Sequence, residues 1–407
     1  MTKNNHWRFS GNELKYIKNV LDTGFSAGKS ASMNEKLEKK FAKIHNQKYS
    51  ITANSGTSTL HMALDALNVG HGDEVIVPSL TVAMCGYAVW HCGATPVFCD
   101  VDEKTFLIDP IDIQKKITNK TKAIMVVHLY GLMCDMTKIM KISKKYKIPV
   151  IEDCAQCFLG KDELGRISGT IGSVGSWSFE TTKHITTGDG GIVTTNNENY
   201  AISMRKLNSA GYKNLKANSG KIRIHKDKFQ DPNWVRHDKL SYNYRLSEIC
   251  AAVGLAQLER LRFFVKKRNT MGKLFLKTIL KTKTKLLTPQ FVPKKFYHSY
   301  FTFAAKFNGL KFGIKWQDFR KKFIEFGGDG IYAAWKILPE EGPFSKAMKK
   351  GLRSGQILIS KSYGRGETPM AKKIQKNIMQ FTTNQKNKFE MKKQINALKK
   401  TISFFNL

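Results

Sequence analysis

The sequence has few acidic residues and no long apolar run. It contains 32 aspartates and glutamates against 68 lysines and arginines in 407 residues, which gives a formal net charge of +36. No apolar stretch approaches the roughly 18 residues that a membrane-spanning helix requires. The first residues, MTKNNHWRFS, lack the apolar core of a signal peptide. We therefore expect a cytoplasmic protein without a membrane segment.

Cysteine is also scarce, with seven residues at irregular spacing. An odd number of thiols without a regular pattern argues against a disulfide framework. Cys154 and Cys157 form a C-x-x-C pair, but neither a second pair nor a histidine cluster accompanies it to complete a zinc site. We expect these thiols to act as small buried hydrophobic residues, with a redox role as the alternative, and we predict no metal site.

The positive charge is compatible with a nucleic-acid partner, with an anionic small substrate, or with a lysine-rich surface that has no special partner. The lysines are spread along the chain, with some excess after residue 370. No basic module, reading helix or aromatic RNA-binding motif is present. The sequence therefore predicts no nucleic-acid partner.

Short apolar runs alternate with helical patterns between residues 50 and 200. Four of these runs are continuous, as expected for strands covered on both faces: 74–79, 95–101, 123–131 and 148–153. A helical pattern lies between two of them, at 135–147. This alternation predicts an α/β domain with a mostly parallel central sheet, and ligands of such domains bind at the carboxyl ends of the strands.

The character of the sequence changes near residue 266. Apolar positions at helical spacing over 247–265 predict a long helix that leads out of the main domain. Beyond it, aromatic residues and lysines interleave, with a strand candidate at 297–307 and a final helix at 386–405. We expect a large α/β domain, with an N-terminal arm, over residues 1–265 and a smaller α+β domain over residues 266–407.

The start of a predicted helix over 54–67 is a candidate anion site. Gly56, Thr57 and Ser58 lie at this start, where free backbone N–H groups and the helix dipole favour a phosphate. An ordinary capped helix explains the same residues, because serine and threonine are common caps.

A second candidate is the segment VIEDCAQ, residues 150–156. Asp153 follows a strand directly, and its carboxylate could bond a protonated heterocyclic nitrogen. Gln156, about one helical turn further on, could reach the same ligand. A helix N-cap is the alternative explanation for the acidic pair.

A third candidate is the loop that holds Lys183, within SFETTKHITTG, between two strand-like pieces. A lysine forms a Schiff base with a cofactor aldehyde when burial or neighbouring charge leaves its amine partly deprotonated. Ser178, five residues earlier, could bind a cofactor phosphate. The alternative is an ordinary lysine in a hairpin loop.

Taken together and in this order, these segments resemble the DegT/DnrJ/EryC1/StrS family of sugar aminotransferases. The matching motifs are NSGTSTLHMAL, GDEVIVPSLT, GATPVFCDVD, VVHLYG, VIEDCAQ, WSFETTKHITTGDGG and YNYRLSEICAAVGLAQLERL. They cover roughly residues 10–270. The resemblance implies the fold-type I architecture of pyridoxal phosphate (PLP) enzymes and a homodimer with shared active sites.

The resemblance also assigns roles to individual residues. Lys183 is similar to the lysine that attaches PLP covalently, and Asp153 to the partner of the pyridinium nitrogen. Gln156 is similar to the residue that lies over the ring near its 3-hydroxyl. The implied phosphate site consists of Gly56, Thr57, Ser58 and Ser178, completed from the other subunit by Asn243 in YNYR.

The implied activity is amine transfer from glutamate to a nucleotide-diphosphate-linked ketosugar, of the 4-keto-6-deoxyhexose type, by a ping-pong mechanism. Glycan precursor synthesis, such as that of lipopolysaccharide O-antigen, is the pathway expected of the family. Some members carry histidine at the anchor position and act as dehydratases, so lysine at 183 favours amine transfer. A PLP-dependent dehydratase or isomerase, and a non-catalytic regulatory or nucleic-acid-binding protein of the same fold, are the alternatives.

Two features of the sequence bear on substrate and cofactor contacts. Val82 stands where the family usually has an aromatic residue that stacks on PLP, so an aliphatic contact is expected there. Tyr332, Trp335 and His298 are candidates for the sugar site, and core or surface positions in the second domain are the alternative for each.

Overall fold

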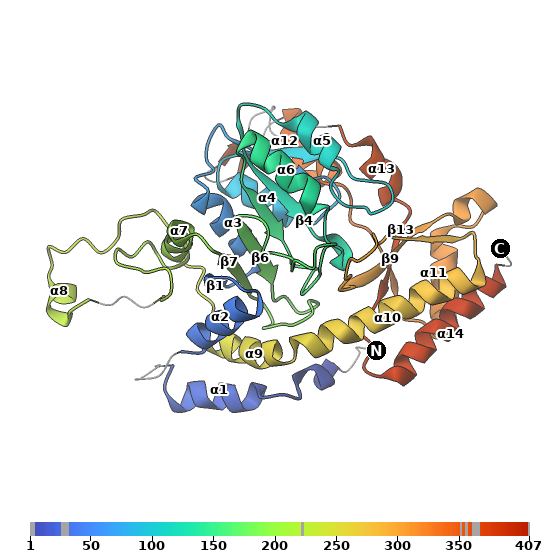
Figure 1. Ribbon diagram of the computed structural model, residues 1–407, viewed down its shortest axis with the longest axis horizontal. Helices are drawn as coiled ribbons and strands as arrows, with labels where there is room; N and C mark the ends of the chain where they lie inside the picture. The colour runs from blue at the N-terminus through green and yellow to red at the C-terminus, as the bar shows by residue number, and fades with distance from the viewer. Residues whose placement is uncertain are drawn as a thin grey trace.

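A seven-stranded sheet is the centre of the larger part of the computed structural model, which describes residues 5–25, 32–220, 224–350, 352–354, 357–359 and 367–405 (Figure 1). Its strands, in spatial order, are β1 (Tyr49–Ala53), β7 (Gly191–Thr195), β6 (Val174–Ser178), β5 (Val150–Asp153), β4 (Thr121–Val127), β2 (Glu74–Pro78) and β3 (Thr95–Cys99). Neighbours from β6 to β3 pair in parallel, whereas β7 is antiparallel to both β1 and β6. The predicted α/β fold with a mostly parallel sheet is confirmed.

Helices cover both faces of this sheet. One face carries α3 (Gly56–Ala66), α4 (Met84–His91), α5 (Pro110–Lys116), α6 (Met136–Tyr146) and α7 (Glu198–Asn208). The other carries α1 (Glu13–Asp22), α2 (Met33–Ile44) and α9 (Glu248–Glu259) (Figure 1). Successive strand residues point to opposite faces. The face under α3 to α7 has one hydrophobic core, here the first core, and the face under α1, α2 and α9 has another, the second core. Accordingly, Ile192 belongs to the second core and its neighbour Val193 to the first.

The expected helix over 247–265 is two helices. Helix α9 ends at Glu259, and α10 (Leu261–Thr282) begins after Arg260, whose φ and ψ of −105° and 6° interrupt the helical path. The apolar pattern continues across this break because both helices bury the same side against the second core, so periodicity alone could not reveal it. Helix α10 runs through residues 265 and 266, where the boundary between the two domains was predicted. That boundary stays a prediction.

A four-stranded antiparallel sheet forms the centre of the C-terminal part. Its strands, in spatial order, are β10 (Ile331–Ala333), β13 (Ile378–Thr382), β9 (Thr302–Phe307) and β8 (Leu287–Pro289). Helices α10, α11 (Trp316–Glu325) and α14 (Lys388–Phe404) pack on it around a third core rich in phenylalanine. The predicted final helix is thus present as α14, and the strand predicted at 297–307 is shorter, as β9.

The remaining elements are short. They are η1 (Asn5–Phe9), η2 (Leu129–Gly131), α8 (Lys226–Gln230), η3 (Gly309–Phe312), η4 (Leu338–Glu340), α12 (Gly342–Lys350), β11 (Leu352–Ser354), β12 (Ile357–Ile359) and α13 (Pro369–Gln375). The segment that contains α8 extends away from the central sheet (Figure 1). Among the helices that the structure describes, none has the length and apolar character to cross a membrane.

Candidate active site

Asp153 ends β5 at the carboxyl edge of the large sheet, with 2% of its surface exposed. Its Oδ1 accepts a hydrogen bond from the N–H of Ala155 (2.9 Å), and its Oδ2 accepts one from Sγ of Cys85 (3.4 Å). Burial raises the pKa of Asp153, and these two hydrogen bonds and the charge of Lys183 offset that only in part. A carboxylate has about four acceptor positions, so Asp153 can still accept from a further N–H group.

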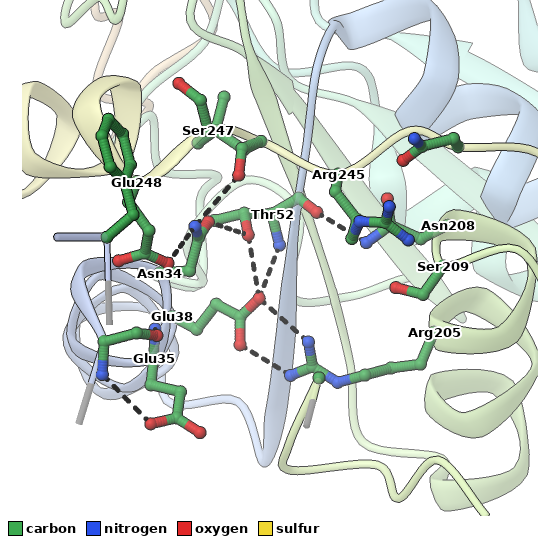
Figure 2. A pocket seen from close by; sticks show the side chains of 15 residues that line it. Asn34, Glu35, Glu38, Thr52, Arg205, Asn208, Ser209, Arg245, Ser247 and Glu248 are labelled. Carbon is green, nitrogen blue, oxygen red and sulfur yellow. Dashed lines mark hydrogen bonds and ion pairs between the residues drawn. The ribbon is translucent and has the colours of Figure 1, made fainter. Parts of the chain in front are cut away.

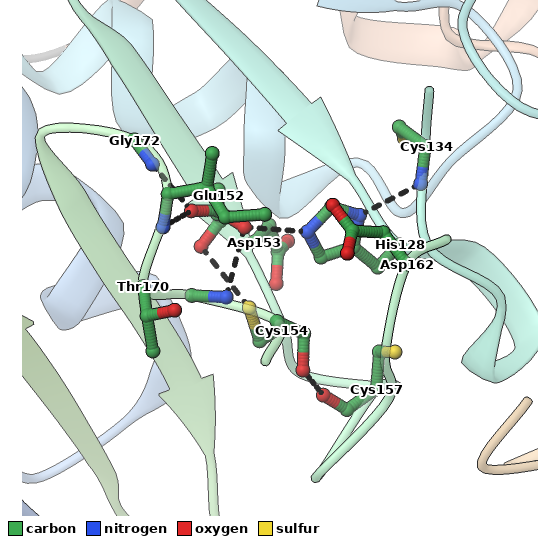
Figure 3. Close-up of polar contacts among 12 residues, drawn as sticks. His128, Cys134, Glu152, Asp153, Cys154, Cys157, Asp162, Thr170 and Gly172 are labelled. Atoms are coloured by element: carbon green, nitrogen blue, oxygen red, sulfur yellow. Dashed lines mark hydrogen bonds and ion pairs between the residues drawn. The ribbon is translucent and has the colours of Figure 1, made fainter. Parts of the chain in front are cut away.

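The neighbouring carboxylate, Glu152, is saturated with donors (Figure 3). It accepts from Nε2 of His128 (2.9 Å) and from the N–H groups of Gly169 (2.8 Å), Ile171 (2.7 Å) and Gly172 (2.6 Å). Burial alone would raise the pKa of Glu152, but the hydrogen bond from His128 and those from the backbone N–H groups lower it overall. Glu152 therefore carries its charge in a fully satisfied site.

His128, Glu152 and Cys154 place potential ligand atoms within 4.8 Å of one another. The N–H of Cys134 donates to Nδ1 of His128 (3.1 Å), so the Nε2 atom that faces Glu152 carries the proton and cannot bind a metal. Burial raises the pKa of the Cys154 thiol. These three groups thus form a structural hydrogen-bond network.

Lys183 lies half-buried in the loop between the antiparallel strands β6 and β7. Its Nζ is 4.9 Å from the ring centre of Phe301, on the segment before β9. Burial lowers the pKa of the Lys183 amine, the charges of Asp153 and Glu180 oppose this, and the charge of Arg268 adds to it. The structure therefore brings the predicted lysine and Asp153 into electrostatic contact, and burial lowers the pKa of the Lys183 amine.

The predicted phosphate residues also lie together. Gly56, Thr57 and Ser58 form the first turn of α3, and the N–H of Ser58 donates to Oγ of the capping residue Ser55 (3.1 Å). Within the described part of the chain, the N–H groups of Gly56 and Thr57 have no acceptor. A Cβ atom at Gly56 would lie 2.7 Å from Cβ of Ser178, so only glycine permits this approach of the helix to the end of β6. Two free donors and the Ser178 hydroxyl thus face one place.

Gln156 is 3% exposed, and its Oε1 accepts a hydrogen bond from the N–H of Tyr130 (2.8 Å). That bond fixes the amide, so its nitrogen can only donate. Tyr130 has a φ of 63°, which is strained for a residue with a side chain. Such strain is typical of functional sites, and here it holds the backbone that orients Gln156.

Asn243 lines a cavity of its own beside the phosphate residues, and its neighbour Tyr244 accepts a hydrogen bond at its carbonyl from the N–H of Asn54 (2.7 Å). Asn243 is exposed, and the cavity of about 480 Å³, seen in Figure 2, is also lined by residues such as Asn34, Asn208 and Arg245. A buried ion pair between Glu38 and Arg205 forms one wall, with Nη2 of Arg205 2.6 Å from Oε2 of Glu38. None of the other predicted site residues lines this cavity.

Three further residues, Val82 and His298 from the sequence analysis and His184 next to the lysine, lie in structural positions. His184 is buried, and its Nε2 is 3.1 Å from the carbonyl of Ser299. Val82 is half-buried and packs against the first core. His298 is also buried, where its ring contacts Gln290 and stacks on Tyr300, so it cannot line an open sugar site.

The remaining sugar-site candidates, Tyr332 and Trp335, are 57% and 47% exposed. Sequence reasoning missed Cys85, because a cysteine in an apolar helix resembles ordinary core. Its proximity to Asp153 arises only when the fold brings the start of α4 to the end of β5.

Comparison with known proteins agrees with this geometry. The model of the DegT/DnrJ/EryC1/StrS aminotransferase family matches residues 9–324. The chain belongs to this family. It is 40% identical over 270 residues to the GDP-perosamine synthase of Escherichia coli O157:H7, covering 66% of this chain and 69% of that protein. It is 41% identical over 257 residues to the GDP-perosamine synthase of Caulobacter vibrioides, covering 62% and 63%.

The solved structure of an aminotransferase from Psychrobacter cryohalolentis superposes with a TM-score of 0.83 at 28% identity, over 97% of each chain. This chain is thus a PLP-dependent aminotransferase of fold-type I, as the motifs predicted. The described residues fit this cofactor chemically: Lys183 supplies an amine, Asp153 a carboxylate with open acceptor positions, and the start of α3 free phosphate donors. The individual contacts stay predictions.

Proposed function

We propose that this family aminotransferase transfers an amino group from glutamate to a GDP-linked 4-keto-6-deoxyhexose. The names of its relatives, GDP-perosamine synthases at 40% and 41% identity, support the nucleotide and the sugar class. The product, a GDP-linked amino sugar, would serve a glycan such as lipopolysaccharide O-antigen. The observation that carries the chemistry is the half-buried Lys183 amine beside the Asp153 carboxylate.

Lys183 attaches the cofactor and then moves protons. Bound PLP supplies an electron sink that stabilises negative charge next to the amine-bearing carbon. Because burial lowers the pKa of its amine, Lys183 can attack an aldehyde and later act as a general base and acid.

The other site residues orient the cofactor. Asp153, with open acceptor positions, would hold the protonated ring nitrogen, and the amide nitrogen of Gln156 would be available to donate to the cofactor. The N–H groups of Gly56 and Thr57, with the hydroxyl of Ser178, would hold the phosphate at the positive end of α3. The hydroxyl of Ser58 donates to Oδ1 of Asn54 (2.6 Å), so Ser58 would contribute only after that hydroxyl turns.

We propose a homodimer in which Asn243 completes the phosphate site of the opposite subunit. Asn243 lines a cavity that none of the other predicted site residues lines, and this supports the arrangement. An exposed amide on a cavity wall is free to donate to a group that another chain presents.

The proposal is tested by incubating the protein with PLP, glutamate and a panel of ketosugars linked to GDP, UDP or dTDP, and by reading the products by mass. We expect an amino sugar with the GDP substrate and 2-oxoglutarate as the second product. Loss of a hydroxyl without amine transfer would instead establish the dehydratase alternative.

A matched pair of variants tests the anchor. Lys183→Ala should abolish the visible absorbance that PLP gives with the protein, whereas Lys141→Ala, on the exposed surface of α6, should retain it. A wild-type protein that stays colourless with PLP would overturn the proposal.

A further inference from the structure

Two buried arginines from distant parts of the chain converge on the backbone of the Lys183 loop. Arg8 in η1 donates from Nη1 to the carbonyl of Thr181 and from Nη2 to that of Lys183, both at 2.7 Å. Arg268 in α10 donates from Nη2 to the carbonyl of Thr182 (2.9 Å) and, at 3.4 Å, to that of Lys183. Three successive carbonyls of the loop are therefore held from outside it.

Both arginines are themselves fixed. Arg268 also donates from Nη1 to the carbonyl of Phe301 (2.7 Å), beneath the ring that the Lys183 amine faces. The carbonyl of Arg8 accepts from Nε2 of Gln257 (2.6 Å) and Nη1 of Arg260 (3.0 Å), which ties η1 to the junction of α9 and α10. Both arginines are thus held at a second point. We call the four hydrogen bonds from the two guanidinium groups to the loop carbonyls the donor fork.

Their charges are not neutralised by a contacting carboxylate. Arg8 and Arg268 are 4% and 6% exposed, and in the described part of the chain neither has a carboxylate within 4.0 Å. Buried charges are costly and are normally paired. Neutral carbonyls satisfy the hydrogen bonds but leave the positive charge in place, so stability alone does not account for this arrangement.

The surroundings of the Lys183 amine contain charges of both signs. Asp153 on β5 and Glu180 in its own loop favour the ammonium form, and Cys85 on α4 acts in the same direction if ionised. Arg268 on α10 opposes them. Arg8 on η1 donates to the same loop, and the charge of Glu180 partly offsets the effect of burial on the pKa of Arg8. Burial lowers the pKa of Arg268 to about 9, so its guanidinium group still carries a positive charge at neutral pH.

We infer that Arg8 and Arg268 are positioning residues: their guanidinium donors hold the Lys183 loop, and the charge of Arg268 acts on the Lys183 amine that attaches the cofactor. The inference rests on the proposed function of Lys183. It also couples the N-terminal segment and α10 to the anchor, because each contributes one arm of the fork.

The test measures how fast the visible absorbance of the lysine–cofactor link forms when PLP is added to cofactor-free protein, from neutral to alkaline pH. Arg268→Gln removes charge and fork, so the midpoint of the pH profile should rise by about one unit. The rate at neutral pH should then fall about tenfold. Arg268→Lys keeps the charge, so the midpoint should stay and the rate should fall severalfold at every pH.

Lys267→Gln is the matched control, because Lys267 is the neighbour of Arg268 on α10 and does not contact the loop. Arg8→Gln removes the hydrogen bonds to the carbonyls of Thr181 and Lys183, so the rate should fall severalfold at every pH; this variant carries the test if Arg268 variants do not fold. Profiles of Arg268→Gln and Arg8→Gln that match Lys267→Gln would overturn the inference while the wild-type link still forms. Absence of the link in wild-type protein would instead defeat the proposed function.

Discussion

Glu152 and Asp153 are adjacent buried carboxylates on one strand, yet their surroundings differ in every respect that matters for chemistry. Glu152 accepts hydrogen bonds from one histidine and three backbone N–H groups, and its pKa is lowered. Asp153 accepts from one N–H and one thiol, and burial raises its pKa. Since successive strand residues face opposite sides, one position can be structural while the next is open to a ligand.

The comparison teaches how to separate structural from functional carboxylates. Burial is the same for both, so it does not discriminate. The number of donors does discriminate. A buried carboxylate whose acceptor positions are all filled stabilises the fold, whereas the cost of burying one with unfilled positions is offset only when a ligand donates to it.

The largest expected effect is on the activity of Asp153→Asn. The amide can no longer hold a proton on the ring nitrogen, so we expect turnover to fall roughly 10²- to 10³-fold. The stability of the cofactor-free protein should not fall, since a costly buried carboxyl is replaced by a neutral amide. Steady-state kinetics and urea unfolding test both parts, with the exposed Asp227→Asn as a control. Retention of full turnover would remove the distinction between the two carboxylates.

Glu152→Gln should show the converse. The side-chain nitrogen of the glutamine would face N–H groups that donate to a carboxylate oxygen in the wild type. These groups would lose their acceptor, so we expect a loss of about 3 kcal/mol in the free energy of unfolding. Turnover per folded molecule should fall less than in Asp153→Asn. Urea unfolding of the cofactor-free protein measures the loss, and an unchanged midpoint would show that the network around Glu152 is not structural.

The pH dependence of stability should differ in sign between the two sites. The folded pKa of Glu152 lies below its ordinary value of 4.5, so its contribution is present above that pH and is lost as the pH falls through the folded pKa. The folded pKa of Asp153 lies above 3.8, so ionisation of Asp153 reduces stability as the pH rises.

The destabilisation by Glu152→Gln should therefore grow from about pH 3 to pH 6. Over the same range, Asp153→Asn should gain stability relative to wild type. Urea unfolding at several pH values gives both curves, and parallel curves for the two variants would contradict the assignment.

The smallest expected effect is at Cys85. Its thiol is a weak donor to Asp153, so Cys85→Ser, which keeps a donor, should change turnover less than about threefold. Cys85→Ala should lower turnover somewhat more, because Oδ2 loses its partner. A loss at Cys85→Ala as large as that at Asp153→Asn would make the thiol more than an auxiliary partner.

Much of the central fold was predictable because its signals are local. Strands β2, β4 and β5 are continuous apolar runs, and the parallel order of such strands places residues like Asp153 at a common edge. The motifs around Gly56 and Lys183 are likewise contained within single turns and loops, so the sequence exposes them directly.

The contacts that join distant segments were not predictable. Arg8 and Lys183 are 175 residues apart, and nothing in the pattern around either residue points to the other. The break at Arg260 has no glycine or proline to mark it. His298 lies in a segment rich in exposed-looking aromatics, yet the packing of Tyr300 against α10 buries it.

Helix α10 has a consequence for enzyme engineering. Hybrids that exchange C-terminal segments between relatives are one way to seek an altered sugar preference. The start of this helix, at Leu261, is an obvious choice for the junction. A junction there would separate Lys183 from its own Arg268 and pair it with whatever residue the other parent carries at that position. Hybrids joined after Thr282 keep both in their original register, so they should retain cofactor attachment more often than hybrids joined at Leu261.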